Sequence, residues 1–141
     1  MVKIDEYDFP DDLYYTSDHL WIRVEDDKFR VGLNDFGAKA AGKILIVRLK
    51  PTNSRIEAKK PFGTIESAKW VSGLTLPFTC TITEVNEALK KKPSLINEDP
   101  YNQGWMIVVK PEDVNAALKT LYHGESLIHW AVEDIKKRLK K

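Results

Sequence analysis

One stretch of the chain has a short apolar run on each side of a polar turn. Residues 62–67 lead into the turn and residues 71–82 lead away from it, with apolar side chains that include Ile65 and Leu74. Two apolar runs separated by a few polar turn residues are typical of a β-hairpin. Its tip carries Lys69. Because most lysines are solvated surface charges, this local pattern alone assigns Lys69 no function.

Other short segments also have the composition of β-strands. Strands are expected over residues 20–24, 29–33, 44–49, 78–85 and 105–110, and the β-branched run within 44–49 predicts a well-buried strand. Helices are expected over residues 36–41, capped by Asn34 or Asp35 and ended by Gly42, over 87–91, and from Pro111 onward. Many short strands followed by a helical end predict a mainly β barrel or sandwich with C-terminal helices.

The last segment, residues 125–141, has the pattern of an amphipathic helix. Its apolar residues recur at helical spacing, and lysines gather near its end, where they favour the helix dipole. The apolar positions are Leu127, Ile128, Ala131, Val132, Ile135 and Leu139, and the lysines are Lys136, Lys137 and Lys140. Two alternatives remain open: the helix packs on its own barrel, or it docks a partner.

Composition restricts the classes of function. The chain has 141 residues, enough for one domain, and its 22 basic and 21 acidic residues nearly cancel. No general field therefore attracts it to nucleic acid or to an anionic membrane. The single cysteine, Cys80, excludes an internal disulfide framework and fits a reducing compartment, while three scattered histidines argue against a zinc site. Without a signal segment or a membrane-spanning run, we expect a cytoplasmic protein.

Several motifs occur together in the order found in one known family. They are Tyr15–Val24, Val31–Phe36, Glu66-Ser67-Ala68-Lys69, Glu84–Leu89 and Asn97–Tyr101, followed by Gly104-Trp105. With these motifs the chain resembles the H protein of the glycine cleavage system from about Leu13 to Leu121. The resemblance implies a lipoyl-domain-like hybrid barrel-sandwich. Residues 1–123 would form the lipoyl-carrier domain, and residues 124–141 a C-terminal helix packed on it or extending it.

The same resemblance implies a carrier and not an enzyme. Lys69 would bear lipoic acid through an amide bond, attached by a lipoate ligase or lipoyltransferase. The partners implied are glycine decarboxylase, aminomethyltransferase and dihydrolipoyl dehydrogenase. The lipoyl group would receive an aminomethyl group from glycine and pass it on, and the chain would only position and shelter that group.

Residues around Lys69 have candidate supporting roles. A hairpin held by Ile65 and Val71 would keep the lysine rigid and exposed. Glu66 and Ser67 are candidates for contact with the attaching enzyme, or they only shape the turn. Trp70, a large aromatic beside the lysine, suggests contact with the lipoyl arm or with a partner.

Residues outside the hairpin, among them a histidine, the cysteine and two tryptophans, also have predicted roles. By the resemblance His19 lines the cleft of the arm; otherwise it is a structural histidine. Cys80 has no partner base in a local motif, so it is expected in the core rather than as a nucleophile. Trp21 and Trp105 are also expected in the core, and residues 97–101 as a turn whose side chains bond nearby backbone.

Two departures from the family pattern concern the cargo. Leu20 and Gly73 occupy positions where the family usually has carboxylates that help to hold a cationic aminomethyl group. The segment from Glu66 to Val71 is also similar to H-like lipoate-binding proteins of sulfur-oxidising, heterodisulfide-reductase-like systems, which implies a sulfur cargo as an alternative. A third alternative is an unmodified interaction module that uses the hairpin and the C-terminal helix.

Overall fold

The computed structural model describes residues 2–139. The first residue of the predicted carrier domain and the last two residues of the predicted C-terminal helix, which are Met1, Lys140 and Lys141, lie outside the described residues. The elements, in chain order, are β1 (Val2–Ile4), β2 (Tyr7–Phe9), β3 (Tyr14–Tyr15), β4 (Leu20–Glu25), β5 (Lys28–Leu33), α1 (Asp35–Ala41), β6 (Ile44–Leu49), β7 (Arg55–Ile56), β8 (Pro61–Ser67), β9 (Val71–Thr75), β10 (Cys80–Val85), α2 (Ala88–Lys91), α3 (Leu95–Glu98), β11 (Ile107–Pro111), α4 (Val114–Leu118) and α5 (Glu125–Leu139). The predicted mainly β architecture with C-terminal helices is confirmed.

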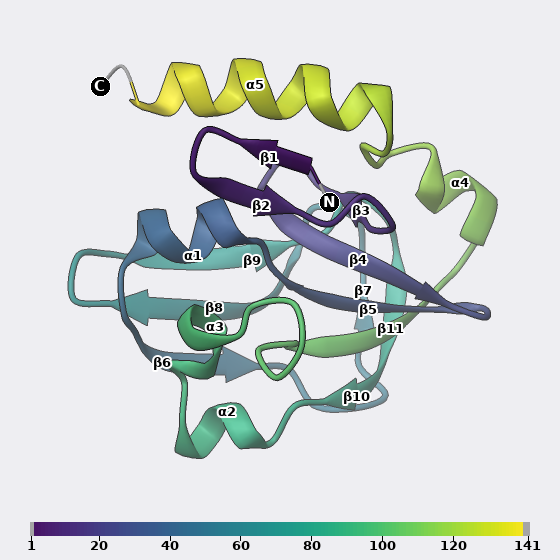
Figure 1. Cartoon of the computed structure of the whole chain (residues 1–141). Coiled ribbons are helices and arrows are strands. Elements are labelled where there is room, and N and C mark those ends of the chain that lie inside the picture. The colour runs from purple at the N-terminus through teal and green to yellow at the C-terminus, as the bar shows by residue number, and fades with distance from the viewer. Residues whose placement is uncertain (1, 140–141) are drawn as a thin grey trace.

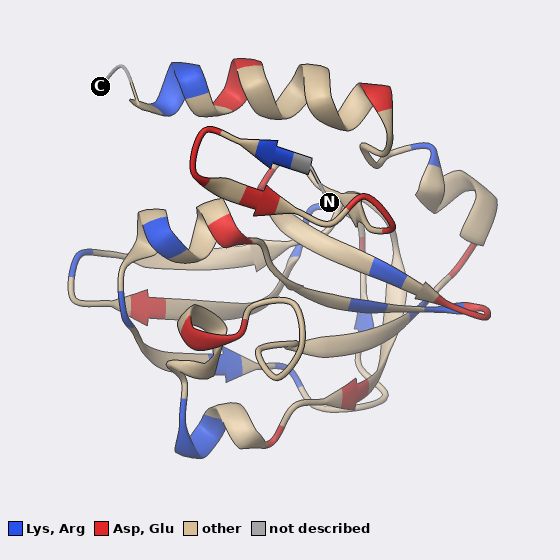
Figure 2. Ribbon diagram, in the orientation of Figure 1, with Lys and Arg blue, Asp and Glu red and all other residues tan. Residues whose placement is uncertain are grey.

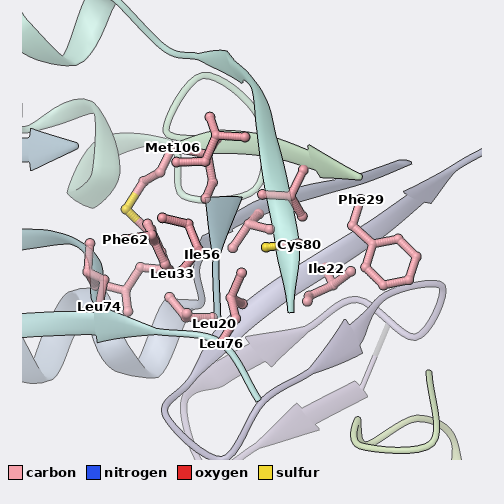
Figure 3. Packing of buried hydrophobic residues seen from close by; sticks show 14 of the residues in the cluster. Leu20, Ile22, Phe29, Leu33, Ile56, Phe62, Leu74, Leu76, Cys80 and Met106 are labelled. Carbon is pink, nitrogen blue, oxygen red and sulfur yellow. The ribbon is translucent and has the colours of Figure 1, made fainter. Parts of the chain in front are cut away.

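Two antiparallel sheets enclose the main hydrophobic core (Figure 1). One contains six strands in the order β3-β4-β5-β11-β10-β7, and the other contains three strands in the order β6-β8-β9. Figure 3 shows side chains of both sheets meeting in this core, among them Phe29 from the first and Phe62 from the second. Cys80 lies among them and is buried, as predicted. The alternation seen in the sequence therefore directs one face of each sheet inward.

The lysine hairpin, which we define as β8, β9 and the turn between them, forms the second sheet together with β6. Ile65 pairs with Val47 on one side and with Ser72 on the other, so β8 is the central strand. At Gly63 the neighbouring strand approaches so closely that an added Cβ would lie 2.3 Å from the Arg48 carbonyl oxygen. Backbone ladders on both sides thus hold the hairpin rigid.

A second hydrophobic cluster joins the two ends of the described chain. The β1–β2 hairpin packs beneath α5, which crosses the top of the molecule in Figure 1. From α5, Leu127, Ala131 and Ile135 are buried against residues such as Phe9. We call β1, β2 and α5 the terminal layer. The predicted helix therefore packs on its own fold. The β1–β2 hairpin beneath it was not predicted.

The amphipathic stripe of α5 is only partly buried. Ile128 and Val132 are each 43% exposed, and Leu139 is 59% exposed. Some apolar residues of α5 stay exposed because the surface that α5 covers is narrower than its apolar stripe. Within the described residues, no helix is long and apolar enough to cross a membrane. Both signs of charge are spread over the elements (Figure 2).

Three local predictions are wrong. The strand β6 is not well buried, since Leu45 is 49% and Ile46 is 38% exposed. The reason is that β6 is an edge strand whose outer face meets solvent. Its register with β8 is also interrupted between Ile44 and Ile46. Pro111 ends β11 instead of opening a helix, and Asp113 caps α4 by accepting from the Ala116 amide. Trp105 is half-buried, with the Arg30 guanidinium 4.5 Å from its ring centroid.

Candidate functional site

The turn between β8 and β9 is closed by hydrogen bonds of one serine. The Ser67 amide donates to the Trp70 carbonyl oxygen at 2.9 Å. The Ser67 Oγ accepts from the amides of Lys69 and Trp70, at 3.2 and 3.4 Å. A hydroxyl that satisfies two turn amides fixes the backbone on which the lysine stands. The geometry thus gives Ser67 a turn-shaping role, one of its two predicted alternatives.

Lys69 is exposed at the tip of the lysine hairpin and its side chain crosses the end of α1. A Cβ added at Gly42 would lie 3.4 Å from Lys69 Cε and 3.7 Å from Lys69 Nζ. Gly42 also has φ +78°, which L side chains adopt at a cost. The predicted glycine stop of the helix is therefore confirmed, and the same glycine leaves room for the lysine stem.

Asn97 holds the backbone beneath Lys69. Its Oδ1 accepts from the Ile44 amide at 2.8 Å, and its Nδ2 donates to the carbonyl oxygens of Ala38 and Gly42, at 3.2 and 2.7 Å. The expectation that Asn97 bonds nearby backbone in a turn is wrong, since its partners lie 53 to 59 residues away. Nothing in its local sequence, on the short helix α3, indicates this role.

Only one of the two residues expected to hold the hairpin does so. Ile65 is buried, whereas Val71 is 63% exposed. In the ladder Glu66 stands between Ile46 and Val71, so these three residues share the outer face of the sheet. Trp70 is 38% exposed beside Lys69. The outer face next to the lysine is therefore accessible and partly apolar.

A cleft of about 240 Å³ lies beside the lysine hairpin. Its walls come from the hairpin, from α1, from the segment that precedes β4, and from the end of α5. The residues that line it include Asp18, His19, Phe36, Ala40, Ile65, Trp70, Ser72, Gly73, Thr75 and Arg138. A larger open hollow of about 990 Å³ follows α5 beside Trp130, but no residue of the lysine hairpin lines it. The smaller cleft is lined by Trp70, which follows Lys69 in the chain.

His19 forms part of the cleft wall and is held on both ring nitrogens. Its Nδ1 lies 3.0 Å from Asn34 Nδ2, and its Nε2 lies 2.5 Å from Asp134 Oδ2 on α5. The Asn34 Oδ1 accepts from the Gly37 amide as the cap of α1, so the Asn34 amide group can only donate to His19. Nδ1 is then an acceptor, and Nε2 carries the proton that is donated to Asp134. His19 is therefore neutral.

The protonation state of this pair has a clear physical origin. Burial lowers the pKa of His19 below its usual value, although the hydrogen bond to Asp134 acts in the opposite direction. Partial burial acts to raise the pKa of Asp134, but hydrogen bonds from His19 and Arg138 outweigh it and lower that pKa. Arg138 Nε lies 2.6 Å from Asp134 Oδ2. A neutral histidine thus faces an ionised, paired carboxylate.

The structure brings some predicted site residues together and adds others. Lys69, Ser67 and Trp70 share the hairpin turn, with Glu66 adjacent on the outer face, and His19 and Trp70 both line the cleft. Asp18, Asp134 and Arg138 were not predicted. The spacing of Asp134 and Arg138 indicates an i,i+4 ion pair on a helix, but no local signal reveals that it meets His19.

Comparisons with known proteins show which family the chain resembles. The family model described as glycine cleavage H-protein matches residues 13–134. The chain is 45% identical over 106 residues to a glycine cleavage system H protein of Geobacillus thermodenitrificans, covering 75% of this chain and 84% of that protein. It is 46% identical over 109 residues to one of Bacteroides thetaiotaomicron, covering 77% and 86%.

A solved structure also matches the fold. The crystal structure of a glycine cleavage system H protein from Mycobacterium marinum superposes with a TM-score of 0.76 at 33% identity, covering 86% of this chain and 98% of that one. This likeness confirms the predicted barrel-sandwich fold class. These relatives carry the glycine cleavage name, so they do not favour the sulfur-carrier alternative. Arg138 lies beyond the end of the family match.

Proposed function

Because the chain belongs to the glycine cleavage H-protein family and is accordingly a lipoyl carrier rather than an enzyme, we propose that Lys69 bears the lipoyl group. One observation carries the proposal: Lys69 stands exposed on a turn closed by Ser67, with its stem over Gly42 and a cleft beside it. An attaching enzyme needs an accessible lysine on a rigid backbone, and the carrier needs a surface on which the arm can rest between visits to partner enzymes. When bound, lipoate supplies a dithiolane that carries a group on sulfur.

The residues next to Lys69 then take separate roles. Ser67 fixes the turn through its two amide contacts. The half-buried Glu66 and the exposed Trp70 offer contact to the attaching enzyme, a lipoate ligase or lipoyltransferase. His19 positions the cleft wall, since its two hydrogen bonds join α1 to α5. Tethering on a short arm keeps the cargo at roughly millimolar local concentration at each docked enzyme.

Family membership implies work with the other proteins of the glycine cleavage system. In detail, the arm would take an aminomethyl group from glycine decarboxylase and pass it to aminomethyltransferase, with dihydrolipoyl dehydrogenase restoring the disulfide. We place this carrier in the cytoplasm, a proposal supported by the single reduced cysteine. We also retain the division into a carrier domain, residues 1–123, and a C-terminal helical segment, residues 124–141.

The proposal is tested by glycine-dependent exchange of labelled carbon dioxide with purified glycine decarboxylase. Lipoylated wild type is expected to support exchange, and Lys69→Arg to abolish it. Lys60→Arg, at an exposed lysine on the same approach to the hairpin, is the matched control and should leave exchange unchanged. Exchange that survives Lys69→Arg, or its absence with wild type whose lipoylation has been verified, would overturn the proposal.

A further inference from the structure

The chain turns from α1 into β6 beneath the lysine stem, and we call this link, Gly42 and Lys43, the corner. Asn97, on α3, donates from Nδ2 to the carbonyl oxygens of Ala38 and Gly42, at 3.2 and 2.7 Å. Its Oδ1 accepts from the amide of Ile44, the first residue of β6, at 2.8 Å. Carbonyl oxygens at a helix end need partners from outside the helix. One side chain therefore holds the corner from both sides.

Two contacts connect the corner to Lys69. The first is through the side chain: a Cβ added at Gly42 would lie 3.4 Å from Lys69 Cε, so the stem passes over the corner. The second is through the backbone. Ile44 is the register partner of Ser67, whose Oγ accepts from the Lys69 amide at 3.2 Å. Asn97 thus holds both the surface under the stem and the strand that borders the turn.

We propose that Asn97 is a positioning residue for the attachment of lipoate, a role that rests on the function proposed above. A free lysine side chain samples many rotamers, and ordering it costs free energy. A fixed corner under the stem limits those rotamers before the attaching enzyme binds, while Lys69 stays exposed. Order that exists before binding need not be imposed during binding, so it favours the encounter.

Asn97 takes no part in the chemistry of attachment. In that step Lys69 Nζ bonds to the carbonyl carbon of an activated lipoyl group, the activating group leaves with its bonding electrons, and Nζ loses a proton. Asn97 instead raises the fraction of chains in which the stem is already in place. Its loss should therefore weaken productive binding to the attaching enzyme and leave the chemical step unchanged.

A second asparagine makes the same set of bonds elsewhere in the fold. Asn86 donates from Nδ2 to the carbonyl oxygens of Gln103 and Trp105, at 2.9 and 2.7 Å. Its Oδ1 accepts from the Ala88 amide at 3.1 Å. None of these groups belongs to the corner or to the lysine hairpin. Because each asparagine bridges two carbonyl oxygens and one amide, the pair separates a role at Lys69 from general support of the fold.

The experiment measures the steady-state rate of lipoate attachment to the unlipoylated protein, at a temperature well below the unfolding of every variant. Asn97→Ser should lower kcat/KM about three- to tenfold, a fraction of the full cost of ordering a lysine side chain. The loss should lie in KM, with kcat unchanged. Asn86→Ser is the matched control and should change neither constant. Equal constants for the two variants, or a loss in kcat alone, would overturn the role of Asn97.

A spectroscopic measurement tests the same proposal without turnover. In unlipoylated wild type, an NOE is expected between the Cε protons of Lys69 and the Cα protons of Gly42, because Lys69 Cε lies next to Gly42. It should weaken in Asn97→Ser and persist in Asn86→Ser. Its absence from wild type would overturn the proposal whether or not the variants fold. Attachment of lipoate to another lysine of wild type would instead contradict the proposed function.

Discussion

The lysine hairpin and the terminal layer are built in different ways. The hairpin is held by backbone ladders, to β6 on one side and between its own two strands on the other. The terminal layer is held by side chains from the two ends of the described chain. It contacts the cleft through the hydrogen bond between His19 and Asp134, which are 115 residues apart in the sequence. The lysine thus stands on strands that lie close together in the sequence, while one wall of its cleft depends on a contact across 115 residues. The two regions should respond separately to mutation.

The largest expected effect is in the core beneath the lysine hairpin. Phe62 is fully buried on β8, so Phe62→Ala leaves a cavity and should lower the free energy of unfolding by about 3–5 kcal/mol. Val71→Ala, on the exposed outer face of the same hairpin, should stay within about 0.5 kcal/mol. Urea denaturation followed by tryptophan fluorescence measures both. Similar costs for the two variants would show that the hairpin is not supported from the core side.

A core substitution in the terminal layer should lower the free energy of unfolding by less, and its effect should be more local. Ile135 is buried on α5, and Ile135→Ala should cost about 2–3 kcal/mol, at the low end for such a change because the helix can settle on the thin layer beneath it. Val132→Ala is the exposed control. Amide hydrogen exchange should speed up in α5 and β1 and remain unchanged in β8. Equal acceleration in the hairpin would mean that the two regions unfold as one unit.

A pH effect should come from the contact between His19 and the terminal layer. The pKa of buried His19 is below its unfolded value of about 6.5. The unfolded chain therefore binds a proton that the folded chain does not, and stability falls as the pH drops from about 6.5 toward the folded pKa, by at most about 1.4 kcal/mol per pH unit. The lowered pKa of Asp134 adds a loss only below about pH 4.

His19→Gln tests the assignment of that slope. Subtracting the variant's stability from that of wild type between pH 7 and 5 isolates the histidine, since the other ionisable groups are common to both. The difference, wild type minus variant, should become smaller as the pH falls from 7 to 5. A slope that persists unchanged in His19→Gln would assign the effect to another group.

The sequence predicts the hairpin region better than the terminal layer, for a physical reason. Alternation and turn chemistry are local, so β4, β5, α1 with its Asn34 cap and Gly42 stop, and the tip at Lys69 follow from neighbouring residues. The burial of β6 does not, because its edge position depends on which strands pair beside it. The roles of Asn97 and Asp134 depend on partners more than 50 residues away, which no local pattern indicates.

The smallest structural effect concerns the one cysteine. Burial raises the pKa of Cys80 to about 12, so its thiolate is scarce at pH 8. Alkylation of the native protein should be about a thousandfold or more slower than that of a free thiol, and should become rapid in urea. Intact mass after iodoacetamide treatment measures it. Rapid native labelling would place Cys80 outside the core shown in Figure 3.

The central claim is that the lysine hairpin presents Lys69 for acylation. Peptide mass mapping after co-expression with a lipoate-attaching enzyme tests it most directly. We expect a single lipoyl group on the peptide that contains Lys69, and no modified peptide in Lys69→Arg. A lipoyl group on any other lysine, or an unmodified Lys69 beside an enzyme shown to be active on another acceptor, would contradict it.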